Sequence, residues 1–261
     1  MPSTRSSSGT SGRIRNSVMS ESMDRHGRLG QLGLKTQYLQ AMGIQPWVPR
    51  DDSAAVNDNV ADAPPVAARD AAAPAWADLE ARVASCTLCG LHEGRTQTVF
   101  GTGNRQADWL IIGEAPGADE DRQGEPFVGR AGLLLNEMLL AAGYRREQVY
   151  IANILKCRPP NNRNPHADEV QCCHGYLQQQ IDLIQPRLIL AVGGIAAHNL
   201  LGTDGPVGKL RGTEHHYGDR QIPLVVTYHP AYLLRSPLEK RKVWADLQFA
   251  RRIFNSTGRD I

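Results

Sequence analysis

The chain has 261 residues, enough for one large domain or two small ones with a sizeable hydrophobic core. Its 29 lysine and arginine residues against 27 aspartate and glutamate residues leave a formal charge of +2, so no global basic field indicates a nucleic-acid partner. The apolar runs are far shorter than the roughly 18 residues of a membrane helix, and no signal peptide opens the chain. We therefore expect a cytoplasmic protein whose five cysteines serve metal binding or catalysis rather than disulfides.

Residues 1–74 have the composition of a disordered tail and linker. Residues 3–12 are almost entirely serine, threonine and glycine, and residues 51–75 are mostly alanine, proline and aspartate. Such segments bury too little apolar surface to offset the entropy lost on ordering. We therefore expect the folded domain to span residues 75–257.

One island of bulky residues interrupts this tail at residues 36–50. Tyr38, Leu39 and Met42 have helical spacing, and Trp47 supplies a further anchor. Such a segment serves either as a motif that binds a partner's groove or as a lid on its own domain, and we weigh the two equally. The island resembles the N-terminal peptide of the psi subunit of the bacterial replicative clamp loader, which implies a contact with that assembly.

From Trp76 onward, short apolar runs alternate with longer amphipathic stretches. The apolar runs predict buried strands at 109–112, 149–152, 188–192 and 224–227, and the amphipathic stretches predict helices at 130–142, 166–184, 194–201 and 239–254. This alternation is typical of a parallel sheet covered by helices on both faces. Active sites in such sheets lie beyond the carboxyl ends of the strands, so we expect functional residues in the loops that follow them.

Four cysteines form a candidate metal centre. Cys86 and Cys89 are separated by two residues, as in chelating hairpins, and Cys157 follows a predicted strand. With Cys173 they supply four thiolates, which suit a zinc ion or an iron–sulfur cluster, and spacing alone does not separate these two. The alternative is one chelating pair beside unrelated buried thiols.

The helix period selects Cys173 over its neighbour Cys172. Asn164 is predicted to cap the helix, with Pro165 at its first position. Cys173 then shares the apolar face, whereas Cys172 lies about 100° away around the axis.

Polar side chains follow three of the predicted strands. Glu114 comes directly after the first strand, Asn153 ends the second, and His229 follows the last. The glycine-rich turn beside Glu114 matches neither a P-loop nor a dinucleotide-binding fingerprint. A lone histidine after a strand is usually structural, but three polar groups at one edge of a sheet favour a site.

Together these features resemble the family 4 uracil-DNA glycosylases, the iron–sulfur members of the uracil-DNA glycosylase superfamily, from about Trp76 to Phe254. The resemblance is carried by the four cysteines, Asn153, and the motifs Gly-Glu-Ala-Pro-Gly at 113–117, Lys-Cys-Arg-Pro-Pro at 156–160 and His-Pro-Ala-Tyr-Leu-Leu-Arg at 229–235. It implies a three-layer α/β/α sandwich with a central four-stranded parallel sheet. It also implies a structural [4Fe–4S] cluster on Cys86, Cys89, Cys157 and Cys173, with zinc as the alternative. The implied activity is DNA repair by excision of uracil through hydrolysis of its N-glycosidic bond.

The resemblance also implies catalytic and base-reading roles. His229, as a neutral imidazole, would donate a hydrogen bond to uracil O2, and Glu114 would stabilise the cationic sugar, orient water, or both. Asn153 would read the Watson–Crick edge of the flipped base and Phe127 would stack on its face. The best-known superfamily members carry an aspartate where this chain has Ala115, so the water-activating role of Glu114 stays open.

Further residues would shape the pocket and contact DNA. Gly113 and Ala115 would border the pocket through backbone groups, and Glu120 would block the space that a thymine methyl needs. An apolar wedge and a phosphate contact would come from the residues after the histidine: Leu233, Leu234 and Arg235. The loop residues predicted to form a basic patch near DNA are Lys156, Arg158, Arg163, Lys209, Arg211 and Arg235.

We expect a monomer that acts on uracil in single- or double-stranded DNA, in the cytoplasm with the nucleoid and with no membrane contact. The competing hypothesis is a catalytically inactive module of the same fold that binds DNA or a partner protein. The presence of Glu114, Asn153 and His229 argues against it.

Overall fold

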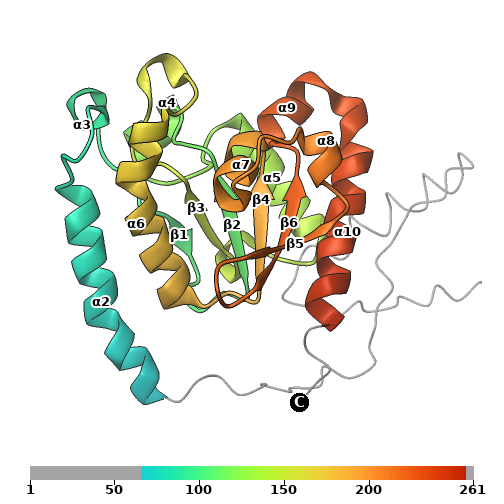
Figure 1. Ribbon diagram of the computed structural model, residues 1–261, viewed down its shortest axis with the longest axis horizontal. Coiled ribbons are helices and arrows are strands. Elements are labelled where there is room, and N and C mark those ends of the chain that lie inside the picture. The colour runs from blue at the N-terminus through green and yellow to red at the C-terminus, as the bar shows by residue number, and fades with distance from the viewer. Residues whose placement is uncertain (1–65, 257–261) are drawn as a thin grey trace, which may run out of the picture. The chain divides into compact units, whose positions relative to one another are not determined.

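The computed structural model describes residues 66–256 (Figure 1). The predictions for the tail, including the partner-binding motif at 36–50, therefore lie outside the described residues. Helix α2 begins at Val66, inside the segment whose composition predicts a linker up to residue 74. None of the helices within the described range is both long and apolar enough to span a bilayer.

A single six-stranded sheet with the order β1-β3-β2-β4-β6-β5 forms the centre of the fold. The strands are β1 (Thr102–Gly103), β2 (Trp109–Gly113), β3 (Tyr150–Asn153), β4 (Leu188–Val192), β5 (Glu214–Tyr217) and β6 (Ile222–Thr227). The four central strands are parallel, and β1 and β5 add to the two edges in antiparallel orientation. The predicted four-stranded parallel sheet is confirmed as the core of a larger sheet.

Helices cover both faces of this sheet, which confirms the three-layer sandwich (Figure 1). The α-helices are α2 (Val66–Ala84), α3 (Leu91–Gly94), α4 (Ala118–Gln123), α5 (Arg130–Ala141), α6 (Ala167–Ile184), α7 (Gly194–Leu201), α8 (Val207–Leu210), α9 (Pro230–Arg235) and α10 (Lys240–Ser256). Short 3-10 helices are η1 (Arg146–Gln148), η2 (Pro160–Asn162) and η3 (Pro237–Glu239). The four predicted helices correspond to α5, α6, α7 and α10.

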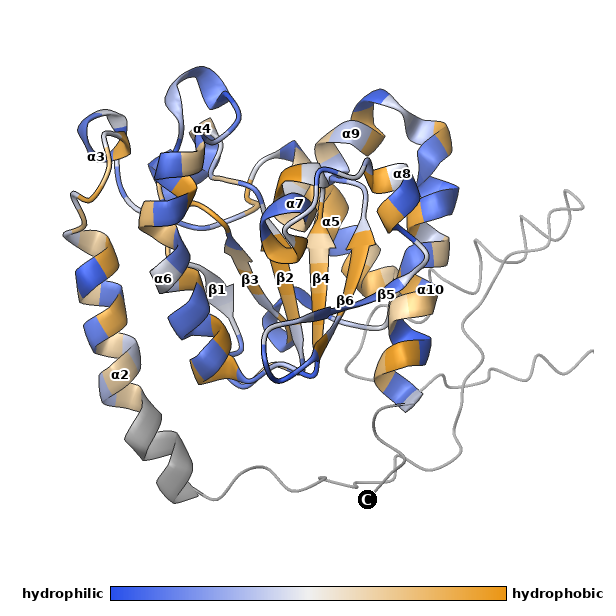
Figure 2. Cartoon of the chain, in the orientation of Figure 1, coloured by the Kyte–Doolittle hydropathy of each residue, from blue (hydrophilic) through white to orange (hydrophobic). Residues whose placement is uncertain are grey.

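Alternate residues of the strands pack into two separate hydrophobic layers. Leu110 and Ile112 pack with α6 and α7 on one face, whereas Trp109 and Ile111 pack with α5 and α10 on the other. Figure 2 shows the hydrophobic central strands between helices whose apolar stripes face them. Burial on both faces explains why these strands are continuous apolar runs in the sequence.

The start of α6 differs from the prediction. Asn164 and Pro165 precede the helix, which begins at Ala167. The Glu169 carboxylate accepts a hydrogen bond from the His166 amide at 2.8 Å, so this pair closes the first turn two residues later than expected. The apolar face is unaffected, and Cys173 lies buried on it as predicted.

Candidate active site

A pocket of about 490 Å³ opens beyond the carboxyl ends of the parallel strands. Its walls come from the loops after β2, β3 and β6 together with α9. The predicted site residues that line it are Glu114, Ala115, Glu120, Phe127, Asn153, His229 and Arg235. The three polar groups that were predicted at separate strand ends therefore line one cavity.

Asn153 presents an unsatisfied amide oxygen to this pocket. Its side chain is buried, and Oδ1 has no hydrogen-bond partner among the residues that the structure describes. Gly113 pairs with Asn153 across the adjacent parallel strands. A Cβ atom at Gly113 would lie 2.4 Å from Asn153 Oδ1 and 2.6 Å from Phe127 Cζ, so only glycine admits both side chains. A buried acceptor without a partner marks a position where a ligand donor is expected.

Phe127 forms the aromatic wall of the pocket. Its backbone lies in the left-handed region at φ 54°, which is unfavourable for an aromatic residue. Its ring centroid lies 5.5 Å from that of His229, with 31° between the ring planes. The ring thus faces the pocket beside the Asn153 amide and the histidine.

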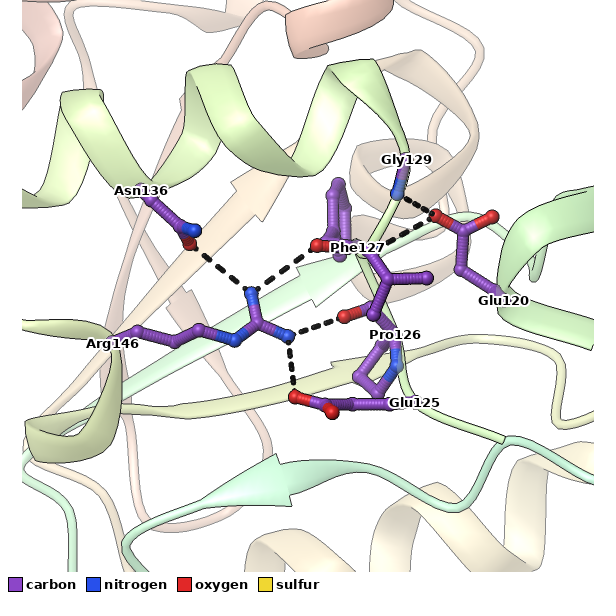
Figure 3. A network of polar contacts seen from close by, with 8 residues as sticks. Glu120, Glu125, Pro126, Phe127, Gly129, Asn136 and Arg146 are labelled. Atoms are coloured by element: carbon purple, nitrogen blue, oxygen red, sulfur yellow. Dashed lines mark hydrogen bonds and ion pairs between the residues drawn. The ribbon is translucent and has the colours of Figure 1, made fainter. Parts of the chain in front are cut away.

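Glu120 holds the backbone around the pocket. One carboxylate oxygen accepts hydrogen bonds from the Val128 and Gly129 amides at 3.1 and 3.2 Å, and the other accepts from the Gly117 amide at 3.1 Å. Figure 3 shows the Glu120 carboxylate directed at the segment that carries Phe127. Glu120 is therefore a pocket wall whose carboxylate oxygens are held by backbone donors.

His229 is the N-cap residue of α9. Its Nδ1 atom accepts a hydrogen bond from the Ala231 amide at 3.2 Å, so the proton of the neutral ring resides on Nε2. Burial, reinforced by the positive charge of Arg235, lowers the pKa of His229 to about 4. At neutral pH the ring is therefore an uncharged donor that lines the pocket.

Glu114 supplies the second ionisable group of the pocket. It follows β2 directly, and its backbone carbonyl accepts a hydrogen bond from the Leu155 amide at 3.1 Å. Burial raises the pKa of its carboxyl group. A carboxylate held in a partly dry pocket interacts more strongly with a developing positive charge than one in water.

The candidate DNA-contacting residues on α9 separate into exposed and buried ones. Leu234 is 43% exposed, and Arg235 lines the pocket. Leu233, in contrast, is completely buried in the hydrophobic layer with α5 and α10. The assignment of Leu233 to a DNA wedge was wrong, because the helical turn directs its side chain into the core.

Of the predicted basic patch, Lys156 is buried and Arg211 is half-buried. Lys156 is buried, and its ammonium group donates to the Asn153 carbonyl at 3.0 Å and to Gln180 Oε1 at 2.6 Å. Arg211 pairs with the buried carboxylate of Asp246 at 2.7 Å. The prediction that Lys156 contacts phosphate is wrong because its side chain is buried, whereas that for Arg211 stays a prediction.

The four candidate metal-ligating cysteines lie in one region. Cys157 and Cys173 are buried and pack with Cys89, while the half-buried Cys86 adjoins this group beside Tyr176. Burial, together with the neighbouring Cys157 and Cys89, raises the pKa of the Cys173 thiol to about 11. Within residues 66–256, no three cysteine, histidine or acidic side chains converge tightly enough to hold a single metal ion.

Cys172, the fifth cysteine, differs from Cys173 in its surroundings. It is half-buried, and its sulfur atom donates to the Leu88 carbonyl at 3.3 Å. It also adds to the electrostatic effect on the Cys89 thiol, so burial rather than proximity distinguishes the two neighbouring cysteines.

Comparison with known proteins establishes the family. Residues 100–248 match the sequence profile of the uracil DNA glycosylase superfamily. Over 182 residues the chain is 43% identical to the type-4 uracil-DNA glycosylase of Thermotoga maritima, an alignment covering 68% of this chain and 93% of that protein. The chain belongs to the uracil DNA glycosylase superfamily.

Within the superfamily the similarity is highest to type-4 proteins among those compared. The Archaeoglobus fulgidus type-4 uracil-DNA glycosylase is 42% identical over 177 residues, which is 66% of this chain and 89% of that protein. The type-5 uracil-DNA glycosylase of Pyrobaculum aerophilum is 27% identical over 146 residues, which is 50% of this chain and 64% of that protein. The predicted resemblance to family 4 is confirmed.

Several residues at or near the pocket of this superfamily member were not predicted from the sequence. The loop between β3 and α6 contributes Asn162 to the pocket wall, beside Arg163 of the predicted basic patch, and α9 contributes Tyr232. Arg146, in η1, contacts the segment that carries Phe127. Two of its four acceptors are backbone carbonyls, which no motif in the sequence indicates.

Proposed function

We propose that this protein excises uracil from DNA by hydrolysing the N-glycosidic bond of an extruded deoxyuridine and leaving an abasic site. The observation that carries the proposal is the buried, unpartnered Oδ1 of Asn153 beside the Phe127 ring. Uracil offers N3–H to such an acceptor and O4 to the amide donor, whereas cytosine reverses this pattern. The names of the similar type-4 proteins support the same substrate.

His229 would stabilise the leaving base. As the glycosidic bond breaks, negative charge develops on uracil O2, and a donor aimed there acts more strongly in the transition state than in the ground state. The Ala231 amide occupies Nδ1, which leaves the Nε2 proton for the base. Because the pKa of His229 is about 4, the ring donates a hydrogen bond without carrying a net charge.

Glu114 would act on the sugar. Both Glu114 and Glu120 line the pocket, but the Glu120 oxygens already accept from three backbone amides. Glu114 is therefore the carboxylate that we assign to the oxocarbenium-like sugar and to orienting the attacking water. Glu120, which lies beside the backbone segment that carries Phe127, would limit the space available to a thymine methyl.

We further propose that Cys86, Cys89, Cys157 and Cys173 hold a [4Fe–4S] cluster rather than zinc. A zinc ion bound by four thiolates at about 2.3 Å brings the sulfur atoms to about 3.8 Å from one another. The four thiols share one region of the described structure, and the resemblance to family 4 favours the cluster over zinc there. A cluster accepts more widely spaced thiolates, one on each iron. When bound, it would cross-link α6 to the loops that hold the other three cysteines and supply no reaction step.

The DNA contacts would come from the rim of the pocket. Arg235 and Arg163 line its mouth and carry positive charge, and Leu234 is exposed on the adjoining helix. We propose a monomer that takes uracil from single- or double-stranded DNA. Because its substrate is DNA, we place the enzyme in the cytoplasm with the nucleoid.

Uracil release by the full-length protein tests the function. Oligonucleotides with one uracil, single-stranded or opposite guanine or adenine, are incubated with the protein, and abasic sites are counted after alkaline cleavage. Matched oligonucleotides with cytosine or thymine at that position are the controls. We expect cleavage of the uracil strands alone. A well-folded protein that leaves every uracil strand intact would instead support the inactive binding module.

A further inference from the structure

The segment Glu125–Val128 and the following Gly129, here called the Phe127 strap, connects α4 to α5 and carries the aromatic wall of the pocket. Phe127 holds a left-handed backbone conformation that its side chain disfavours, so neighbouring groups must maintain it. At Gly132, a Cβ atom would lie 1.7 Å from the Phe127 carbonyl oxygen. The first turn of α5 therefore lies directly against the strap backbone.

Arg146 contacts the strap on the side away from the pocket. Its guanidinium donates to the Pro126 carbonyl at 2.5 Å and to the Phe127 carbonyl at 3.4 Å. The same group also donates to Glu125 Oε1 at 3.1 Å and to Asn136 Oδ1, on α5, at 3.2 Å. Figure 3 shows the guanidinium at the centre of these four contacts. Only 16% of the Arg146 side chain is exposed.

Glu120 contacts the strap with the opposite polarity. Arg146 donates to carbonyl groups at positions 126 and 127, and Glu120 accepts from amide groups at positions 128 and 129. Arg146 thus holds the peptide groups on both sides of the strained residue, and Glu120 holds the second of these and the next one. Glu120 lines the pocket, but Arg146 does not belong to its lining.

We propose that Arg146 is a positioning residue for the reaction, which fixes the Phe127 strap and thereby the ring that faces the base. The inference rests on the proposed function, because it assigns Phe127 to stacking on uracil. Arg146 is not part of the pocket lining, and two of its acceptors are carbonyls of the strap, so its effect should depend on the Phe127 ring.

The geometry of the contacts requires arginine rather than lysine. A guanidinium presents donors in a planar fork that reaches two successive carbonyls and two side-chain acceptors together. A lysine ammonium keeps the charge, but it is a point donor on a flexible stem. Arg146→Lys should therefore leave the fold intact while loosening the strap.

A double-mutant cycle in the full-length protein tests the proposal. Steady-state uracil release is measured for the wild type, Arg146→Lys, Phe127→Leu and the double variant, with thermal unfolding recorded for each. We expect Arg146→Lys to lower kcat/KM between about tenfold and a hundredfold in the wild-type background. In the Phe127→Leu background we expect the same change to lower it by less than about threefold, because the ring it positions is gone.

Two further variants make the test specific. The adjacent Arg145 is exposed, and Arg145→Lys, the matched control, should leave kcat/KM unchanged. Asn136→Ala removes one acceptor of Arg146 without altering the strap, and should produce a smaller loss that again depends on Phe127. This variant takes the place of Arg146→Lys in the cycle if the latter fails to fold.

The outcomes separate this proposal from the proposed function. Equal losses in both backgrounds, or full activity of folded Arg146→Lys, would show that Arg146 does not act through the ring and would overturn the inference alone. A folded wild-type protein that releases no uracil would overturn the proposed function, and the positioning role with it. Coupling between Arg146 and Phe127 in an active wild type confirms both.

Discussion

The Nδ1 atom of His229 accepts a hydrogen bond from the Ala231 amide at 3.2 Å, so the proposed uracil donor also caps α9. Asparagine is a good N-cap residue but cannot extend a donor to the position of Nε2. His229→Asn should therefore lower kcat by about a hundredfold to a thousandfold with little change in stability. His229→Ala should lose as much activity and, in addition, about 0.5–2 kcal/mol of stability through the missing cap. Uracil release and urea unfolding distinguish the two, and a His229→Asn variant with normal kcat would exclude the donor role.

The acid limit of activity should be set by Glu114. The proposed mechanism requires an ionised Glu114 and a neutral His229. Burial raises the pKa of Glu114 above its ordinary value of 4.5, whereas His229 stays neutral down to its pKa of about 4. As the pH falls, Glu114 is therefore protonated first, and activity falls through its pKa.

The pH profile of Glu114→Gln checks this assignment. The variant should be much slower at every pH, and the acid limit of its residual activity should move down to about pH 4, where His229 becomes charged. An unchanged acid limit in Glu114→Gln would assign the titration to another group.

Gly113→Ala should inactivate the pocket without unfolding the protein. The added methyl group would lie 2.4 Å from Asn153 Oδ1 and 2.6 Å from the Phe127 ring, so both base-contacting side chains must shift. We expect at least a hundredfold loss of uracil release. Gly175→Ala, on α6, is the matched control because its Cβ atom meets nothing within 4 Å. It should keep full activity and gain about 0.5–1 kcal/mol of stability. Comparable activity of the two variants would contradict the close fit at Gly113.

Cys173→Ser should remove the cluster, whereas Cys172→Ser should retain it. Cys173 is buried with Cys157 and Cys89, and Cys172 is directed at the Leu88 carbonyl. Iron and acid-labile sulfide content, together with the visible absorption of the purified proteins, give the result. A colourless wild-type protein with one zinc ion would show that zinc is bound in place of the cluster. If Cys172→Ser lost the cluster and Cys173→Ser kept it, Cys172 would be the ligand.

Deletion of residues 1–65 should leave uracil release unchanged, because every pocket residue lies beyond it. Deletion through residue 84 additionally removes Trp76, Leu79 and Val83, which are buried against the rest of the domain. Each such side chain contributes about 1.5–3 kcal/mol, so the longer deletion should lower the urea midpoint sharply. Equal midpoints for the two deletions would mean that α2 does not stabilise the fold.

The tail motif has a separate test. The clamp-loader psi contact expected from residues 36–50 predicts that the full-length protein retains the clamp loader in a pull-down and that the protein lacking residues 1–65 does not. Equal retention by both proteins would end that assignment.

The central strands and main helices could be predicted because burial on two faces leaves continuous apolar runs and a helical period. The edge strands could not: β1 has two residues, and β5 reads Glu-His-His-Tyr, without an apolar run. Figure 2 shows β5 as a largely hydrophilic strand.

Site residues were predictable where the strand ends and the family motifs named them. The prediction for Leu233 was wrong because its place shortly after His229 in the sequence does not reveal the direction of its side chain on α9. The prediction for Lys156 was wrong because a lysine in a loop motif is normally exposed. Its burial here depends on Gln180, which is distant in the sequence and lies on α6. Arg146 was not predicted because the strap carbonyls that accept from it leave no mark on residue identity.

The buried Lys156 lies in the short segment that joins Asn153 to Cys157. Its Nζ atom donates to the carbonyl of Asn153, and the next residue is Cys157, so the amide proposed to read the base and a proposed cluster ligand share one short buried stretch. On that proposal, loss of the cluster should disturb Asn153 and abolish uracil release, rather than produce an enzyme that removes the wrong base.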